Sequence, residues 1–167
     1  MDIIEGTVFI FGNNIDTDQI YPGRYLDLTE PQEIAVHAME GADATFVASM
    51  KTGDIIVDGT NFGCGSSREH AVIALKNAGV RAVVAKSFAR IFFRNAFNQG
   101  LVVIEAPDLD ELSLVPSDRA KLDVEKGKFT ARGKCITFPP LPGHILDIIE
   151  AGGIFSLFRD RGIGAFG

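Results

Sequence analysis

A block of alternating apolar strands and helices in the middle of the sequence limits the folds open to this chain most strongly. Short apolar runs at 55–57, 82–85 and 101–104 contain no alternation with polar residues, which is typical of parallel strands buried on both faces. Amphipathic segments at 67–78 and 88–98 separate these runs, and each is followed by a glycine. Strands that alternate with helices in this way form a right-handed layer, so the sequence predicts an α/β fold.

The two ends of the chain have a different pattern. Residues 6–11 are typical of a first strand, and a long polar and aromatic connection over 14–29 follows it. Residues 121–138 alternate around a Lys-Gly and an Arg-Gly pair, which predicts antiparallel hairpins. An amphipathic helix with a break at a Gly-Gly pair is expected over 145–158. Some antiparallel strand is therefore expected beside the α/β layer.

Composition and charge exclude several classes of protein. The net charge of −6 argues against a basic face for nucleic acid. No stretch approaches the roughly 20 apolar residues of a membrane helix, and the first residues lack the basic start and apolar run of a signal peptide. With 46% hydrophobic residues, the chain of 167 residues can form one core, and we expect a single domain over 1–167.

The cysteine content sets a limit on metal chemistry. Cys64 and Cys135 are the two cysteines of the chain, and they fit the reducing cytoplasm better than a disulfide scaffold. An iron–sulfur cluster takes three or four thiolates. We therefore expect a cytoplasmic chain that holds no cluster and no metal by itself.

A glycine-rich turn at 63–68 (GCGSSR) joins a predicted strand to a predicted helix. Such a turn leaves backbone N–H groups free at a helix N-terminus, where they and the helix dipole attract anions. Arg68 adds a planar donor fork for a carboxylate or phosphate, and Ser66 and Ser67 place hydroxyls beside it. The turn therefore predicts capture of an anionic substrate with a hydroxyl held near it.

Three other patterns compete with this interpretation of the turn. A phosphate-binding P-loop needs Gly-Lys-Ser/Thr, and no lysine is present here. A hydrolase nucleophile elbow needs Gly-x-Ser-x-Gly, which is absent. The third pattern is purely structural, with Ser66 or Ser67 as the helix cap and Glu69 or His70 in the first turn. The turn alone leaves the anion site and the capped helix equally open.

Three ordered blocks resemble the signature of aconitase swivel domains and of the small subunits of isopropylmalate isomerase. They are 14–20 (NIDTDQI), 61–71 (NFGCGSSREHA) and 85–96 (AKSFARIFFRNA). At the family's spacing they cover the chain from about residue 6 to 105, and the length is close to that of the short archaeal-type small subunits. The resemblance implies a swivelling β/β/α domain. It also implies a hydro-lyase that isomerises 2-isopropylmalate to 3-isopropylmalate in leucine biosynthesis by dehydration and rehydration.

The same resemblance implies that the chain acts only with a partner. In this family a separate large subunit carries a [4Fe–4S] cluster, whose open iron binds the substrate as a Lewis acid. A heterodimer or heterotetramer is therefore implied, in which this chain covers a site for a small di- or tricarboxylate. Small subunits of homoaconitase or of a methyl-substituted malate dehydratase are the alternative enzymes. A non-catalytic anion-binding module is the alternative of another class.

The matching positions carry the family's site residues onto this chain. Ser66 takes the place of the base that removes the proton from the carbon next to the departing hydroxyl. A serine can do this as an alkoxide only where backbone N–H groups and an arginine stabilise the charge. Arg68 would hold a substrate carboxylate, with Ser67 as a further donor. Asp18 matches the family aspartate that pairs with catalytic groups across the subunit interface.

Substrate choice in the family lies in the loop after the Asp-Thr-Asp block, which here is 21–29 (YPGRYLDLT). Homoaconitases have an arginine two residues beyond the tyrosine, where Asp27 would repel an additional carboxylate. Leu26 and Leu28 could line an apolar pocket for an isopropyl group. Arg24 is the exception, since a small shift of the loop would aim it inward. The loop favours isopropylmalate and leaves homocitrate-type and methyl-substituted malates open.

Overall fold

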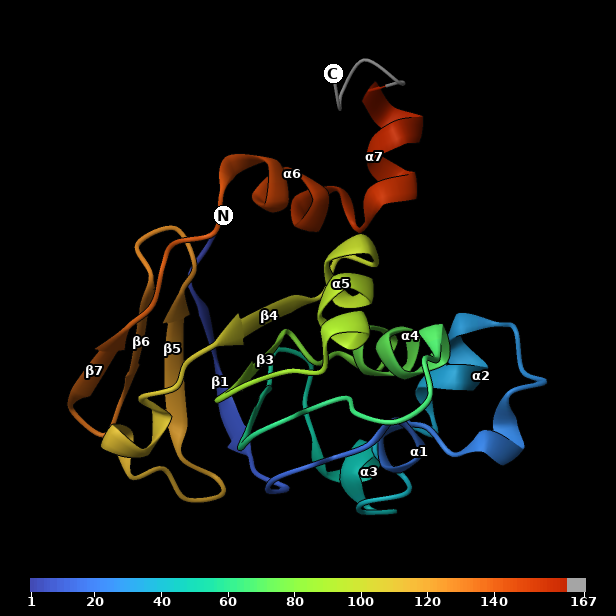
Figure 1. Ribbon diagram of the computed structural model, residues 1–167, viewed down its shortest axis with the longest axis horizontal. Helices are drawn as coiled ribbons and strands as arrows, with labels where there is room; N and C mark the ends of the chain where they lie inside the picture. Colours follow the sequence, from blue (N-terminus) through green and yellow to red (C-terminus); the bar gives the residue numbers. More distant parts are fainter. Residues whose placement is uncertain (162–167) are drawn as a thin grey trace.

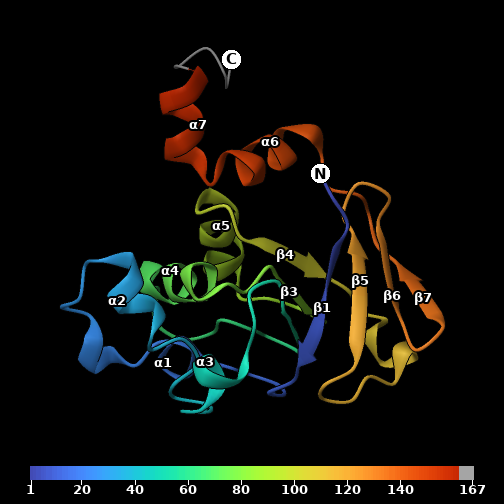
Figure 2. The same ribbon diagram turned by 180° about the vertical axis from the view of Figure 1, so that it is seen from behind.

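A seven-stranded sheet in the order β4-β3-β2-β1-β5-β6-β7 forms the centre of the computed structural model, which describes residues 1–161. The strands are β1 (Ile4–Phe9), β2 (Ile55–Asp58), β3 (Ala82–Ala85), β4 (Val102–Glu105), β5 (Arg119–Asp123), β6 (Lys128–Ala131) and β7 (Lys134–Thr137). β1 to β4 pair in parallel, whereas β5 to β7 continue the sheet from the other edge of β1 in antiparallel pairs. The two kinds of sheet therefore meet at β1 (Figures 1 and 2).

Helices fill the connections between the strands and the C-terminal part. The α-helices are α1 (Thr17–Ile20), α2 (Pro31–Ala35), α3 (Phe46–Ser49), α4 (Glu69–Ala78), α5 (Arg90–Asn98), α6 (Gly143–Ala151) and α7 (Ile154–Arg161). Two short 3-10 helices are η1 (Gly23–Tyr25) and η2 (Leu109–Leu112). α4 and α5 are the crossovers from β2 to β3 and from β3 to β4, as a parallel layer requires.

The parallel strands are buried on both faces. Ile56, Val83 and Val103 belong to one core, which they share with apolar residues of α2, α4 and α5. Ile55 and Val84 belong to a second core, which lies against the apolar side of β5, β6 and β7. This two-sided burial explains why the strands are continuous apolar runs in the sequence.

The architecture confirms the predicted α/β fold with additional antiparallel strand. The three central strands lie within one residue of their predicted positions, and the hairpins β5-β6-β7 occupy the predicted tail. The predicted break in the last helix is also present, since α6 ends before Gly152 and α7 begins after Gly153. The four-residue helices α1 and α3 were not predicted, because a single turn has no apolar periodicity to detect.

The two ends of the parallel layer have different surroundings. α6 and α7 lie beyond the end where β1 begins (Figure 1), and the amino group of Met1 is 3.2 Å from Glu150 of α6. The loops after β1 and β2 leave the opposite end, where the carboxyl ends of the strands gather. This is the edge at which open α/β sheets bind ligands.

Candidate functional site

The loops that follow β1 and β2 run side by side beyond the sheet. The backbone N–H of Gly63 donates to the carbonyl of Ile15 at 2.7 Å, and that of Thr17 donates to the carbonyl of Cys64 at 2.8 Å. These bonds extend the parallel pairing of β1 and β2 past the ends of the strands. The first two sequence blocks are therefore held in a fixed register.

The loop after β3 supports the same glycine turn from its other side. The N–H of Phe62 donates to the carbonyl of Ser87 at 3.1 Å, and the N–H of Ala89 donates to the carbonyl of Phe62 at 2.9 Å. The Ser87 hydroxyl also accepts the N–H of Asn61 at 2.8 Å. The third sequence block (85–96) therefore has a structural role, because its residues hydrogen-bond to the start of the second block, next to the glycine turn, from the side opposite the first block.

Gly63 is the position where the glycine turn tolerates no side chain. Its φ of +84° lies in the left-handed region, and a Cβ atom there would lie 2.3 Å from Cγ of Phe92. Phe92 is buried and packs edge-on against Phe62, with ring centroids 5.2 Å apart. The close contact between the turn and α5 therefore requires glycine.

The two serines of the turn stand in front of α4 and do not cap it. α4 begins at Glu69, its N-cap residue is Arg68, and no side chain accepts a hydrogen bond there. Ser66 and Ser67 are exposed, and neither hydroxyl has a hydrogen-bond partner within residues 1–161. The capped-helix interpretation is therefore wrong, and both hydroxyls are free to meet a ligand.

The backbone of the turn has free donors as well. Within the described part of the chain, the N–H groups of 65–68 donate to no acceptor. They lie ahead of the N-terminus of the ten-residue helix α4, where the helix dipole favours negative charge. This arrangement can stabilise an anion next to the hydroxyls of Ser66 and Ser67.

Arg68 and Asp18 form an ion pair that joins the two loops. Nη1 of Arg68 donates to Oδ1 of Asp18 at 2.9 Å and to the carbonyl of Tyr21 at 3.2 Å. The same Asp18 oxygen accepts the N–H of Gly23 at 2.9 Å. The Arg68 side chain is 19% exposed and that of Asp18 is 68% exposed. The guanidinium is thus fixed in direction and keeps other N–H groups for a ligand.

The electrostatics of Asp18 follow from these contacts. The hydrogen bond from Arg68, and then the one from the Gly23 N–H, hold the pKa of the Asp18 carboxyl below its usual value. α1, which carries Asp18, begins with a capping box: the Gln19 N–H donates to Oδ1 of Asp16 at 2.8 Å, and the Asp16 N–H donates to Oε1 of Gln19 at 3.0 Å. Asp18 is therefore a carboxylate at neutral pH, oriented by a short helix.

His70 connects the turn to the loop at 21–29. Its Nε2 donates to the carbonyl of Leu28 at 2.9 Å, and its ring stacks on Tyr21 with centroids 5.4 Å apart. Tyr21 is fully buried, and its hydroxyl donates to the carbonyl of Tyr25 at 2.6 Å. His70 therefore fixes the position of the loop relative to α4.

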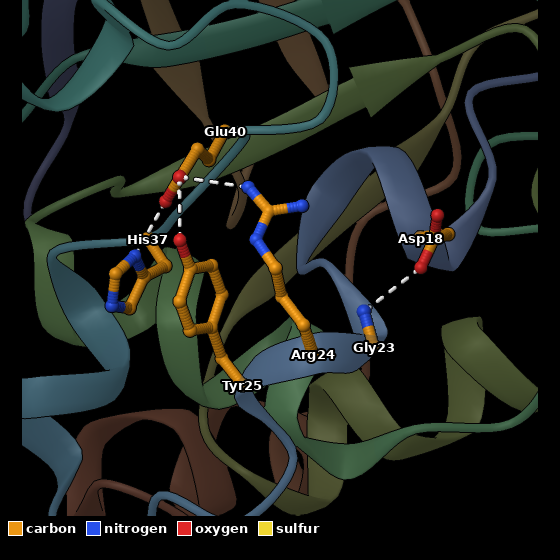
Figure 3. A network of polar contacts seen from close by, with 6 residues as sticks. All are labelled: Asp18, Gly23, Arg24, Tyr25, His37 and Glu40. Carbon is orange, nitrogen blue, oxygen red and sulfur yellow. Dashed lines mark hydrogen bonds and ion pairs between the residues drawn. The ribbon is translucent and has the colours of Figure 1, made fainter.

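Arg24 is held by contacts within the chain (Figure 3). Its Nη2 donates to Oε1 of Glu40 at 3.2 Å, and its guanidinium carbon lies 4.7 Å from the centre of the Tyr25 ring. The hydroxyl of Tyr25 donates to the same Glu40 oxygen at 2.9 Å, and His37 Nδ1 hydrogen-bonds Oε2. Glu40 and His37 had no recognised function in the sequence, because contacts between separate loops have no local sequence signal.

The other three loop residues have different environments. Leu26 is 40% exposed, whereas Leu28 is partly buried against the core next to the helices. Asp27 lies between them and is exposed. Leu26 and Asp27 can therefore reach a ligand on the surface, and Leu28 serves mainly to anchor the loop.

The site is open at the surface. Cavities of about 730, 230 and 190 Å³ are lined by residues other than Ser66, Ser67 and Arg68. The largest of the three lies at the amino ends of the parallel strands, where Lys76 in its wall donates to the carbonyls of Gln99 and Gly152. The free groups of the glycine turn thus face outward, as a site completed by another molecule would.

The described part of the chain has neither a metal-binding group of side chains nor a membrane-spanning helix. Within residues 1–161, no group of three or more His, Cys, Asp and Glu side chains is placed to hold a metal ion. Cys64 lies in the glycine turn and Cys135 in β7, and both are free thiols. No helix in the described region is both long and apolar enough to cross a membrane.

Comparison with known proteins gives matches over almost the whole chain. Residues 10–109 match the Aconitase C-terminal domain family. The 3-isopropylmalate dehydratase small subunit of Thermodesulfovibrio yellowstonii is 50% identical over 95% of each chain. The isopropylmalate/citramalate isomerase small subunit of Methanocaldococcus jannaschii is 47% identical, also over 95% of each chain.

Solved structures agree with the sequence matches. The crystal structure of a 3-isopropylmalate dehydratase from M. jannaschii has a TM-score of 0.88 and 46% identity, and the match covers 96% of this chain and 95% of that one. Aconitase X from Thermococcus kodakaraensis shares the fold alone, with a TM-score of 0.52 and 16% identity over 78% of this chain and 90% of that one. The predicted swivel-type α/β fold is confirmed, and the chain belongs to the aconitase C-terminal domain family of hydro-lyases.

Proposed function

We propose that this chain is the small subunit of a 3-isopropylmalate dehydratase and acts in the cytoplasm as a single swivel-type domain. Together with a large subunit, it would isomerise 2-isopropylmalate to 3-isopropylmalate by removing and re-adding water. The observation that carries the proposal is the exposed Ser66, which stands among unpaired N–H groups beside an arginine fixed by Asp18. The names of relatives that are about half identical to this chain support the same reaction.

Ser66 is the base in this proposal. Its Oγ would take the proton from the carbon next to the one that loses the hydroxyl, and would return a proton when water adds again. A serine can carry that negative charge only where fixed donors surround it. The free N–H groups of 65–68 and the guanidinium of Arg68 are such donors.

Arg68 holds a substrate carboxylate in the same proposal, and Asp18 fixes the direction of Arg68. The Nη1 group is already engaged with Asp18, which leaves the other guanidinium N–H groups for the substrate. Ser67 would add one further hydroxyl donor. Asp18 and Ser67 thus position the substrate, whereas Ser66 acts on the reacting carbon.

The [4Fe–4S] cluster of this reaction belongs to the large subunit. Two cysteines in distant elements do not fit a cluster that needs three thiolates, so the ligand set of this chain is unsuitable. When bound in the partner, the cluster would supply a Lewis acid for the departing hydroxyl. The exposed turn would then cover that site in a heterodimer or heterotetramer.

Reconstitution with a large subunit tests the proposal. The chain is mixed with a large subunit from one of its relatives whose cluster has been restored, and the absorbance of the unsaturated intermediate is followed with 2-isopropylmalate, citramalate and homocitrate. We expect turnover with 2-isopropylmalate. Preferred turnover of citramalate would assign the chain to the second substrate named for the M. jannaschii relative. Binding of malates without turnover would favour a non-catalytic module instead.

A further inference from the structure

Glu40 accepts three hydrogen bonds beside the loop at 21–29. They come from the Arg24 guanidinium, the Tyr25 hydroxyl and the ring of His37, as Figure 3 shows. The side chain of Glu40 is 23% exposed. No member of this cluster belongs to the glycine turn.

The cluster fixes Arg24 from two directions. Its guanidinium carbon lies 4.7 Å above the centre of the Tyr25 ring, and that ring stacks on His37 with centroids 3.6 Å apart and planes 13° apart. Glu40 accepts from the edge of the guanidinium at 3.2 Å. An Arg24 that turned toward a ligand would lose both the aromatic face and the carboxylate.

Glu40 is charged where it meets Arg24. Burial would raise the pKa of its carboxyl, but the hydrogen bonds from His37 and Tyr25 and the charge of Arg24 outweigh burial and lower it. The cation of Arg24 is therefore neutralised locally by a carboxylate that belongs to the chain. The remaining charged side chain of the loop at 21–29 is the exposed Asp27.

The backbone holds Glu40 close to α1. Met39 is fully buried with φ at +57°, and its N–H donates to the carbonyl of Ile20 in α1 at 2.7 Å. A Cβ atom on Gly41 would lie 2.5 Å from the carbonyl oxygen of Asp18, so the chain passes α1 in close contact. The loop at 21–29 is thus held at two points, at Gly23 by Asp18 and at Arg24 by Glu40.

We propose that Glu40 is a positioning residue that sets substrate selectivity by keeping Arg24 neutralised and turned away from the substrate. This inference rests on the proposed function and adds the substrate class to it. A malate derivative with an uncharged side chain would contact Leu26 and would carry no charge for Asp27 to repel. A derivative with a third carboxylate would meet Asp27 and would find no free cation in the loop, because Glu40 already pairs with it.

The test uses the chain in complex with a cluster-loaded large subunit. Glu40→Gln keeps the size of the side chain and its acceptor for Tyr25, but removes the charge that pairs with Arg24. The selectivity ratio is kcat/KM for 2-isopropylmalate divided by kcat/KM for a malate that carries a carboxyalkyl group in place of isopropyl. We expect Glu40→Gln to lower this ratio about fivefold or more, mainly through KM. The matched control Glu33→Gln removes a charge from the exposed face of α2 and should leave the ratio within twofold.

A double variant separates selectivity from mere loosening of the loop. In an Arg24→Ala background, Glu40→Gln has no cation to release, so the ratio should no longer fall. A fall that persists in this background would overturn the proposal, as would a Glu40→Gln ratio equal to that of the control. If Glu40→Gln folds poorly, Glu40→Asp supplies the charge on a shorter stem, and it should restore the ratio of the unchanged chain.

Failure of the inference and failure of the proposed function look different. An unchanged complex that turns over no malate derivative overturns the proposed function and this inference with it. An active complex whose ratio is unaffected by Glu40→Gln overturns the inference alone.

Discussion

Nη1 of Arg68 lies 2.9 Å from Oδ1 of Asp18, although 50 residues separate the two in the sequence. The contact exists because the loops after β1 and β2 continue the pairing of their strands, which brings α1 and the start of α4 together. The geometry of the ion pair therefore depends on the sheet, because the register of β1 and β2 determines where the Arg68 guanidinium points.

Loss of the Asp18 charge should impair catalysis more than stability. Asp18→Asn keeps an oxygen for the Gly23 N–H but releases Arg68, so we expect kcat/KM of the reconstituted complex to fall about 10- to 100-fold. The free energy of unfolding should change little, because the side chain is largely exposed and its ion pair is screened by solvent. Asp108→Asn, an exposed site far along the chain, is the control.

The pH dependence of activity offers a separate check on this pair. Because the hydrogen bond from Arg68 lowers the pKa of Asp18, its carboxylate persists to a lower pH than that of an unpaired aspartate. Protonation of Asp18 should therefore contribute nothing to the pH–rate profile between pH 5 and 9. A step in that range that disappears in Asp18→Asn would contradict this assignment.

Removal of the Ser66 hydroxyl should abolish turnover without unfolding the chain. Ser66→Ala deletes a hydroxyl that has no hydrogen-bond partner within residues 1–161, so the free energy of unfolding should stay within about 0.5 kcal/mol. If Ser66 is the base, kcat should drop by at least about 10³-fold. Ser67→Ala should lose less, since it removes one binding donor. Equal turnover of Ser66→Ala and the unchanged chain would refute the assignment of the base.

Alanine variants of two glycines with a left-handed φ, Gly133 and Gly63, distinguish the cost of backbone strain from the cost of a steric clash. Gly133→Ala, at φ +75° with no atom within 4 Å of the new Cβ, should cost about 1 kcal/mol of unfolding free energy. Gly63→Ala adds a clash with Phe92 at 2.3 Å, and about 3 kcal/mol or more is expected. Urea unfolding of both variants measures the difference, and equal midpoints would show that the turn and α5 can separate at little cost.

Asp58 should make the chain less stable as the pH rises toward 8. Burial raises the pKa of its carboxyl to about 7, against the hydrogen bonds from the N–H groups of Phe11 and Gly12. Its Oδ2 atom has no hydrogen-bond partner in the described chain. Between pH 4 and 7 the folded state therefore holds a proton that the unfolded state has released, and stability falls as the pH rises.

The variant Asp58→Asn cannot ionise and should lose this slope. The unfolding free energy of the variant minus that of the unchanged chain should therefore increase by on the order of 3 kcal/mol between pH 5 and pH 8. Urea unfolding at the two pH values measures this, with Asp27→Asn as an exposed control. Parallel pH dependences of Asp58→Asn and the unchanged chain would rule out Asp58 as the cause.

The sequence predicts the parallel half of the fold well and the site only in part. Strands buried on both faces are apolar at every position, so their pattern is visible without knowledge of their neighbours. The signature blocks predict Ser66, Arg68 and Asp18 as site residues, and the roles of all three stay predictions. The pairing of Arg68 with Asp18 inside the chain was not foreseen, because only strand register brings them together.

The Glu40 cluster shows where prediction from sequence stops. The sequence places Arg24 in the loop at 21–29, but nothing near it in the sequence identifies its partner 16 residues away. The partner, Glu40, follows Met39, whose backbone is in the left-handed conformation. Methionine seldom adopts this conformation, so the sequence does not indicate it. Such a cluster depends on tertiary packing, and only the folded chain reveals it.

β1 has two neighbours that become available at very different times during synthesis. One edge can pair with β2 as soon as Ile55–Asp58 has left the ribosome, whereas the other edge needs β5 at Arg119–Asp123. Until then, the nascent chain carries an open strand edge in its centre, which is a place where chains can associate wrongly. Fragments that stop before β5 should consequently aggregate, even though they contain every residue of the glycine turn.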